Sequence, residues 1–414
     1  MARVLLLFQR FALYLLLLGL PFFTHYLFVH PFAFSFVNLF SLIFIGLGVI
    51  AILTGQLPII QVKDRSLVLI LCLFFASLLY ALPFTHPLRD ALGVLLSRGL
   101  QAFLVGWLVY LMLEADKIKL ENIVRCLFLS FIPLAFTGLL QVSRVLQFSQ
   151  GNRLYEPYDF PNTLARYLFT LILLSFPWLL TQKKQRWGWD IWWVGLILLL
   201  GTQSYNGIVA FLVGVIYLLY LLPSPYRAIR RTGATAWTAT VIFIAIFARH
   251  LPKWEVSITS SRLSRLEFWQ VAIATLKSHY HFLTGIGLKG WENTYPQLVA
   301  LYGPNHPPLN WNSPQPHNFF LDSLLKAGIP GLIAITLLLL WPIWRGWHAS
   351  RHLSFNKYGW FGMSVSAVTL ALLSFGLIDD PIWSDDMMPL LMILLFSLAW
   401  VYSKANPLTV KHEE

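Results

Sequence analysis

The chain has 414 residues, of which 57% are hydrophobic and only 12% are charged. Soluble domains carry roughly twice that charged fraction, so the composition excludes a soluble protein and makes the lipid bilayer the first expected partner. The formal net charge of +12 would suggest nucleic acid in a soluble protein. In a membrane protein the placement of charge matters more than its sum, and no nucleic-acid partner is predicted. Cys72 and Cys126 lie in apolar runs, which predicts neither a disulfide framework nor a metal cluster.

Apolar runs of membrane-spanning length recur from end to end of the chain, and each crossing needs roughly 20 residues. The first run follows Arg3 and lacks a small-residue cleavage site, so we interpret it as a retained helix. The pattern predicts an all-α polytopic membrane protein with a single integral-membrane domain over residues 1–414. About twelve transmembrane helices are expected, near residues 4–22, 34–53, 67–83, 92–113, 123–142, 163–181, 189–203, 206–222, 235–250, 317–345, 358–378 and 388–403.

The charges of the connections predict the orientation. One set of connections is rich in Lys and Arg, whereas the short loops of the other set hold few, with only Arg89 in the third connection. The positive-inside rule makes the basic set and both termini cytoplasmic. The outer face then carries a large loop over 251–316, between spans 9 and 10, and a smaller loop over 143–162. The basic set comprises Lys63, Arg65, Lys117, Lys119, Lys183, Lys184, Arg186, Arg227, Arg230, Arg231, Arg345, Arg351 and Lys357.

The large loop contains an expected amphipathic helix that begins near Ser260 or Ser261 as its cap. Arg262 and Arg265 are three residues apart and therefore neighbours on the helix surface. Two adjacent guanidinium groups suit a diphosphate or an acidic sugar; the alternative is contact with lipid headgroups. The predicted apolar stripe consists of Leu266, Trp269, Ile273, Leu276 and Tyr280.

Three further arginines are candidate ligands for an anion. Arg153 in the smaller loop is expected to reach a ligand, and Arg166 lies one turn inside the following span. A charge at that depth faces a polar cavity or snorkels to the headgroups. Arg98 lies within the fourth span, about two turns below Arg89. With no carboxylate nearby in sequence, an anionic ligand is the favoured partner of Arg98.

His317 is the candidate catalytic residue. It follows Pro316 and is expected to open a helix, where the helix dipole disfavours the imidazolium form and leaves a base suited to neutral pH. The segment from His317 to Arg345 is too long for one straight span. The sequence Gly328-Ile329-Pro330-Gly331 predicts a break, with an outer half-helix before it that carries an Asp322–Lys326 pair.

Two acidic pairs, Asp379-Asp380 and Asp385-Asp386, bracket the last outer turn. No histidine or further carboxylate accompanies them at metal-ligand spacing, so arginine partners or helix capping are favoured over a metal site. The sequence Gly285-Ile286-Gly287 lacks the strand–helix context of a nucleotide loop and carries no functional prediction.

Three segments resemble the O-antigen ligases and polymerases, a superfamily of polytopic bacterial glycosyltransferases that use lipid-linked glycan donors. Arg153, followed by Phe160-Pro161-Asn162-Thr163-Leu164-Ala165, is similar to the Arg…Pro-Asn-x-(Leu/Ala)-Ala stretch of the family. Arg265-x3-Trp269, followed by His281 to Gly287, is similar to its Arg…Trp…Pro-Leu-x-Gly-x-Gly segment. His317-Asn318, nine residues and Gly328-x-x-Gly331 match the ligase signature at every fixed position.

Two positions depart from the family pattern. Many relatives carry Ser-Arg in the turn after the seventh span, where this chain has Ser204-Tyr205-Asn206. One expected arginine is therefore absent from that turn or supplied elsewhere, with Arg153 and Arg166 as candidates. His281 stands where relatives usually have proline.

The resemblance implies a GT-C-like glycosyltransferase of the bacterial inner membrane with a periplasmic active site. It implies transfer of a glycan from undecaprenyl diphosphate to lipid A-core, with inversion and without metal or other cofactor. His317 would be the general base. The residues expected to bind the diphosphate or glycan are Arg265, Arg262, Arg98, Arg153, Arg166, Arg89 and Asn318.

Three alternatives stay open. An O-antigen polymerase would use the same donor with a second lipid-linked glycan as acceptor, and a protein O-oligosaccharyltransferase would use a protein acceptor. A small-anion transporter is the third alternative, but transporters bind near the midplane between repeats. This chain shows no internal repeat, and its unusual charges gather at one face.

Overall fold

The computed structural model describes most of the chain, and the side chains of residues 252–262 fall outside the described part. The described residues are 2–22, 26–28, 34–144, 153–158, 160–182, 186–226, 228–229, 231, 252–304 and 315–405. Their main helices are α1 Ala2–Gly19, α2 Phe36–Leu53, α3 Arg65–Ala81, α4 Leu88–Val94, α5 Ala102–Glu114, α6 Leu120–Leu129, α7 Phe131–Val142, α8 Pro161–Thr181, α9 Arg186–Gly201, α10 Tyr205–Leu221, α12 Pro252–Lys277, α13 His281–Thr284, α14 Gly290–Tyr302, α15 Phe319–His352, α16 Trp360–Gly376 and α17 Met387–Ala405.

Short elements complete the architecture. A π-helical segment, Leu95–Gln101, joins α4 to α5, and another, Phe355–Gly359, precedes α16. Strands β1 Tyr26–Phe28 and β2 Phe34–Ser35 pair antiparallel. Single 3₁₀ turns lie at Leu82–Phe84, Ser224–Tyr226 and Ser278–Tyr280.

The protein is an all-α polytopic membrane protein. Within the described residues, 8 helical segments are long and apolar enough to cross a membrane, and Val4–Gly19 and Tyr205–Leu221 are shorter apolar helices. Every predicted span coincides with a described helix except the one at 235–250, which lies outside the described residues. The count of twelve therefore stays a prediction. Cys72 and Cys126 are free cysteines on α3 and α6.

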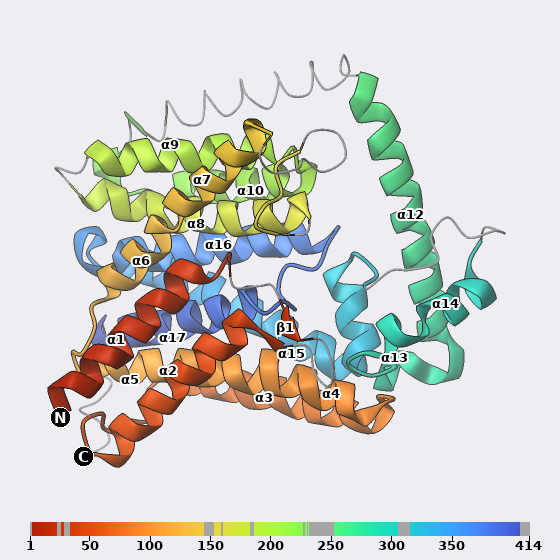
Figure 1. Ribbon diagram of the computed structural model, residues 1–414, viewed down its shortest axis with the longest axis horizontal. Coiled ribbons are helices and arrows are strands. Elements are labelled where there is room, and N and C mark those ends of the chain that lie inside the picture. Colours follow the sequence, from red (N-terminus) through yellow and green to blue (C-terminus); the bar gives the residue numbers. More distant parts are fainter. Residues whose placement is uncertain are drawn as a thin grey trace.

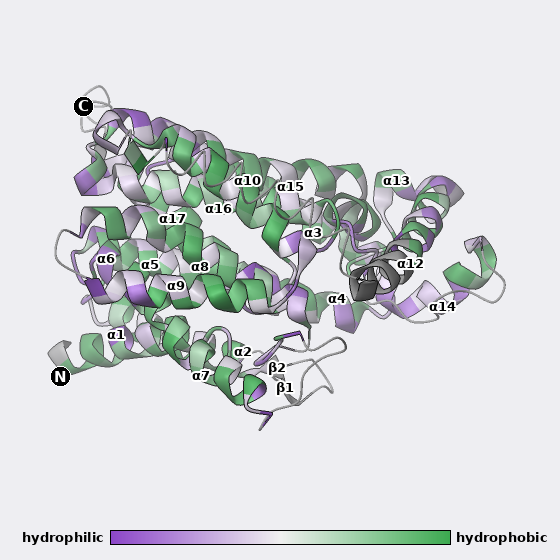
Figure 2. Ribbon diagram, turned by 90° about the horizontal axis from the view of Figure 1, so that it is seen from above, coloured by the Kyte–Doolittle hydropathy of each residue, from purple (hydrophilic) through white to green (hydrophobic). Residues whose placement is uncertain are grey.

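The bundle has a buried centre and an apolar outer surface. Helices α8, α16 and α17 are buried around most of their circumference, because other helices surround them. Helix α2 instead exposes large apolar side chains such as Leu42 and Val49, as expected of a helix that faces lipid. Figure 2 shows hydrophobic residues along the bundle and hydrophilic residues recurring in the helices α12–α14.

Helices α12–α14, here called the α12–α14 layer, lie at the end of the bundle opposite the start of α1 (Figure 1). The layer has its own apolar core, which includes Phe268, Val271, Tyr295 and Val299 and also Leu325 of α15. The large loop is therefore a packed layer that rests on the outer half of α15.

The predicted amphipathic stripe of α12 is largely wrong. Leu266, Ile273 and Tyr280 are exposed, whereas Phe268 and Val271 are buried. Leu276 is buried and Trp269 is half-buried, as expected. The helix also begins at Pro252, upstream of the predicted caps Ser260 and Ser261. Apolar residues occur on both sides of this helix, so periodicity alone does not identify the face that packs against α14 and α15.

The predicted break in α15 is confirmed. Ala327 and Gly328 have non-helical backbone angles, and Gly328 has φ 62° and ψ −159°. They separate an outer half-helix, Phe319–Lys326, from the long span that follows. The Asp322–Lys326 ion pair is present on that half-helix, as the sequence predicted.

The segment Gly285–Gly287 has a structural role at this break. The amide of Ile286 donates to the carbonyl of Leu325 at 2.7 Å. A Cβ at Gly285 would lie 2.7 Å from that same carbonyl oxygen, and a Cβ at Gly287 would overlap Thr85. Gly285 thus allows the α12–α14 layer to approach the backbone of α15 closely, and Gly287 allows it to approach Thr85.

We expect Gly328→Ala to destabilise the protein strongly. Its φ and ψ lie in a region that is essentially restricted to glycine, where strain costs about 1–3 kcal/mol, and its Cβ would overlap the Leu283 carbonyl. The measurement is the thermal unfolding midpoint of the purified protein in detergent. Gly46→Ala in α2 is the matched control, because nothing lies within 4 Å of its Cβ. Equal midpoints for the two variants would contradict the expectation.

Candidate active site

The connection between α16 and α17, residues 377–386, gathers the polar groups of the site and is here called the acidic turn. Its carboxylates Asp379, Asp380, Asp385 and Asp386 are all buried. Burial of four carboxylates in a membrane protein is costly unless each has a polar partner. Each of them has one, and most of these partners come from distant parts of the chain.

Asp379 connects the catalytic candidate to an arginine. Its Oδ1 lies 3.1 Å from Nδ1 of His317, and its Oδ2 lies 4.0 Å from the guanidinium of Arg265. Asn162 and Gln315 donate side-chain hydrogen bonds to the same carboxylate at 3.0 and 3.1 Å. Burial alone raises the pKa of Asp379, but the hydrogen bond and charge of His317, with the charge of Arg265, bring the pKa below its ordinary value. The carboxylate therefore stays ionised until the pH falls through that lowered pKa.

The surroundings of His317 hold its ring in place. The ring of Phe268 stacks against the imidazole with centroids 5.5 Å apart, and Trp269 donates its indole N–H to the His317 carbonyl at 3.4 Å. His317 has φ 52°, a conformation that L residues seldom adopt. The imidazole is thus positioned by α12 on one side and by the acidic turn on the other.

The predicted role of His317 as the opening residue of a helix is wrong. Helix α15 begins at Phe319, and Asn318 is its N-cap, with Oδ1 accepting from the amides of Phe320 and Leu321. The Asn318 amide also donates to the Leu377 carbonyl at 2.9 Å. The group beside the imidazole is the Asp379 carboxylate, 62 residues away in sequence, and not a helix terminus.

Arg153 and Arg265 converge on this side of the site. Arg153 donates to the Thr202 carbonyl at 2.9 Å and to Asn162 Oδ1 at 3.4 Å. Burial lowers the pKa of both arginines, and the positive charge of Arg265 lowers the pKa of Arg153 further. Both side chains contact the hydrogen-bonded pair Asn162 and Asp379, and two half-buried cations that repel each other favour an anion nearby.

The turn in which Tyr205 replaces the arginine of many relatives lies close to Arg153. Ser204 donates its hydroxyl to Asn162 Oδ1 at 2.8 Å, the oxygen that also accepts from Arg153. Arg153 thus lies beside the turn at which many relatives carry an arginine.

Arg98 and Arg166 both have carboxylate partners that the neighbouring sequence did not indicate. Arg98 has a carboxylate partner, since its Nε lies 2.9 Å from Asp385. Arg166 does not snorkel: it is 5% exposed and pairs with Asp386 at 3.2 Å. The partners are 287 and 220 residues away in sequence, which is why inspection of neighbouring residues missed them. The arginine partners favoured for the acidic pairs are present.

Two further predicted ligand residues are Arg89 and Arg262. Arg89 is exposed near the start of α4. Arg262 is part of α12, but its side chain lies outside the described residues. No group of three or more His, Cys, Asp or Glu side chains in the described part of the chain could hold a metal ion.

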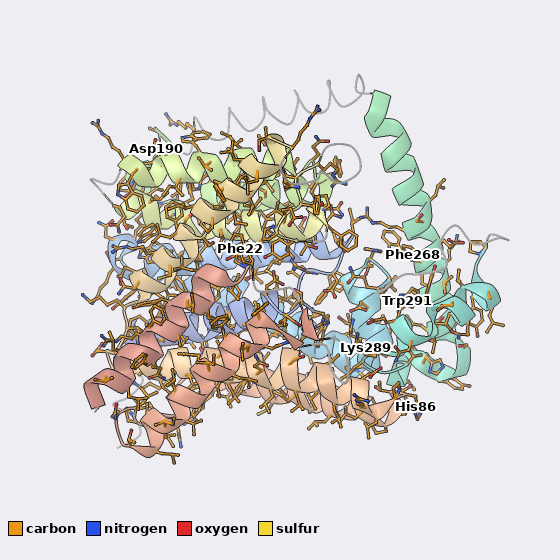
Figure 3. All side chains as sticks on the ribbon, in the orientation of Figure 1. Phe22, His86, Asp190, Phe268, Lys289 and Trp291 are labelled. Atoms are coloured by element: carbon orange, nitrogen blue, oxygen red, sulfur yellow. The ribbon has the colours of Figure 1, made fainter. Side chains whose placement is uncertain are left out.

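A cavity of about 330 Å³ adjoins the cluster, where the outer half of α15, the start of α8 and the segment leading into α14 meet the acidic turn. Figure 3 labels Phe268, Lys289 and Trp291 in this region. Several of the polar lining residues were not among the predicted ligand residues. They are Asn162, Thr163, Lys289, Glu292, Gln315, Asp322, Lys326, Asp380 and Ser384. The proximity of Asn162 to Arg153 and of Gln315 to His317 in sequence was the only available signal.

The arrangement combines an oriented imidazole, a pair of converging guanidinium groups and a neighbouring cavity at one end of the bundle. This combination suits proton transfer beside a polyanionic group. No curated protein matches the chain. Residues 191–336, which contain Arg265, His317 and the break at Gly328, match the family model described as O-antigen ligase. Over these residues the chain is similar to the O-antigen ligase family.

Proposed function

We propose that the protein is an O-antigen ligase that transfers a glycan from undecaprenyl diphosphate to lipid A-core. The family match supports a function of the O-antigen ligase or polymerase type. The observation that carries the finer proposal is the contact of His317 with Asp379, with Arg265 on the other oxygen of the same carboxylate.

His317 acts as the general base. With Nδ1 donating to Asp379, the ring presents Nε2 as a proton acceptor. Nε2 takes the proton of the acceptor hydroxyl as that oxygen attacks the anomeric carbon of the donor. The bond from the anomeric carbon to the diphosphate oxygen breaks, and undecaprenyl diphosphate leaves with the bonding pair. Attack opposite the leaving group inverts the anomeric configuration.

Arg265 and Arg153 bind the diphosphate. Negative charge grows on the leaving group in the transition state, and fixed cations aimed at it stabilise that charge without a metal ion. Arg98 and Arg166 are held by Asp385 and Asp386, so we assign them to the cavity wall next to the glycan.

Loop charges support a periplasmic location. The positive-inside rule makes the basic connections and both termini cytoplasmic. The α12–α14 layer lies at the end opposite the start of α1 (Figure 1), so we propose that the site faces the periplasm from the inner membrane.

The test is a reconstituted transfer assay in EDTA with purified protein, an undecaprenyl-diphosphate glycan and lipid A-core. Glycan on lipid A-core is the expected product. Donor chains that lengthen while lipid A-core stays unmodified would make the protein a polymerase. Absence of both products would overturn the proposal.

A further inference from the structure

The residues that line the cavity differ in charge balance from the residues proposed to bind the diphosphate. Each of the four cationic side chains that line it has a carboxylate partner. Arg98 pairs with Asp385 and Arg166 with Asp386, while Lys326 pairs with Asp322 and Lys289 with Glu292. The lining is therefore nearly neutral. Such a wall suits an uncharged, hydroxylated ligand.

Two tryptophans, Trp291 and Trp383, are among the residues that line the cavity. Trp383 stacks on Phe74 with centroids 5.9 Å apart, and the ammonium of Lys326 lies 5.6 Å from its ring centroid. Trp291 packs against Tyr295 with centroids 4.8 Å apart. Both rings are packed against other side chains, so little conformational entropy is lost when a ligand contacts them. Aromatic surfaces with a few placed polar groups are typical of small-molecule sites.

The same residues carry polar atoms without partners. The indole N–H groups of Trp291 and Trp383 and the hydroxyl of Ser384 are buried with no hydrogen-bond partner in the described structure. Nε of Arg166, whose terminal nitrogens pair with Asp386, is a fourth such donor among the lining residues. Native proteins rarely leave buried donors unsatisfied, so their concentration around one cavity favours a ligand with hydrogen-bond acceptors. They lie behind the cavity surface, so a small rotation of the ring or hydroxyl must accompany binding.

We propose that this cavity is a saccharide subsite that binds one neutral sugar unit of a substrate through Trp383, Trp291 and Ser384. This rests on the proposed function, which supplies glycans on both the donor and the acceptor. The ring packs against the tryptophans, and its hydroxyl or acetamido oxygens accept from the three donors. At about 330 Å³ the cavity is at the small end of the range for such sites, which fits a sugar unit and not a long glycan.

The experiment measures binding to the full chain in lipid nanodiscs. The probes are undecaprenyl diphosphate, the same lipid bearing the glycan, and lipid A-core. Trp383→Phe keeps the aromatic stack and removes the indole N–H, and Ser384→Ala removes the hydroxyl. Each is expected to weaken binding of a sugar-bearing probe by about three- to tenfold and to leave undecaprenyl diphosphate unaffected. The matched control is Trp400→Phe in α17, whose buried indole N–H also lacks a partner but does not line the cavity.

The probe that loses affinity identifies the source of the sugar. If the variants bind the glycan-bearing lipid more weakly, the cavity is the donor subsite. If they bind lipid A-core more weakly, it is the acceptor subsite. Unchanged affinities for both, or an equal loss for undecaprenyl diphosphate, would overturn the proposal. Because binding is measured apart from transfer, a protein that binds selectively but transfers nothing would retain the subsite and lose the ligase assignment.

Discussion

Replacing His317 by alanine is expected to slow glycan transfer by about 10²–10⁴-fold, the usual contribution of a general base. Donor affinity should change far less, because the imidazole acts on the acceptor hydroxyl and the arginines hold the diphosphate. The measurement is kcat and the apparent KM for the donor in the reconstituted assay. Asp379→Asn should also lower kcat, because a neutral amide holds the imidazole of His317 less firmly than the carboxylate does.

His86→Ala is the matched control for this experiment. His86 is exposed in the connection that leads to α4, and its backbone carbonyl, which alanine retains, accepts a hydrogen bond from Asn293. The control should transfer glycan at the wild-type rate. A His317→Ala protein that retains full transfer would remove the histidine from the mechanism and leave the arginine cluster as the only catalytic candidate.

Replacing Arg265 by alanine should lower kcat by about 10²–10³-fold, the cost of removing one oriented group that stabilises developing charge. It should also weaken donor binding, because the diphosphate is charged before the reaction begins. Arg265→Lys should recover only part of the loss, since an ammonium lacks the planar fork that binds phosphate at two points. Inorganic diphosphate offers an independent readout as a competitor of donor binding.

The control for Arg265 is Arg351→Ala, an exposed arginine near the end of α15. It should leave kcat and competition by diphosphate unchanged. If Arg265→Ala were to bind inorganic diphosphate as well as the wild type does, the diphosphate site would have to lie elsewhere, and the arginine would instead position Asp379.

Local patterns predicted the helices of this protein well. Apolar runs located the spans because backbone groups in a bilayer must bond within their own helix, so each crossing needs a continuous apolar segment. The break at Gly328 was equally predictable, since a glycine there allows the positive φ that the chain adopts. The buried face of α12 was not predictable, because apolar residues occur on two faces and only one of them packs against α14 and α15.

The candidate site was predictable only in part. His317, Arg265 and Arg153 stood out because charged or titratable groups are rare in such a chain. The carboxylate partners in the site did not stand out, because each lies far away in sequence. Asp379 is 62 residues from His317, and Asp385 and Asp386 are 287 and 220 residues from their arginines. The cavity wall formed by Trp291 and Trp383 gave no sequence signal, because tryptophan is frequent throughout the chain.

Local features of the sequence are sufficient to predict a helical membrane protein with a broken helix after His317 and a small set of cations at one end. These properties follow from hydrophobic length, backbone geometry and the cost of charge in lipid, all of which act locally. The folded structure is needed to show which arginines pair with carboxylates and which group orients His317. These pairings depend on contacts between helices that are far apart in the sequence, and local sequence patterns carry no information about such contacts.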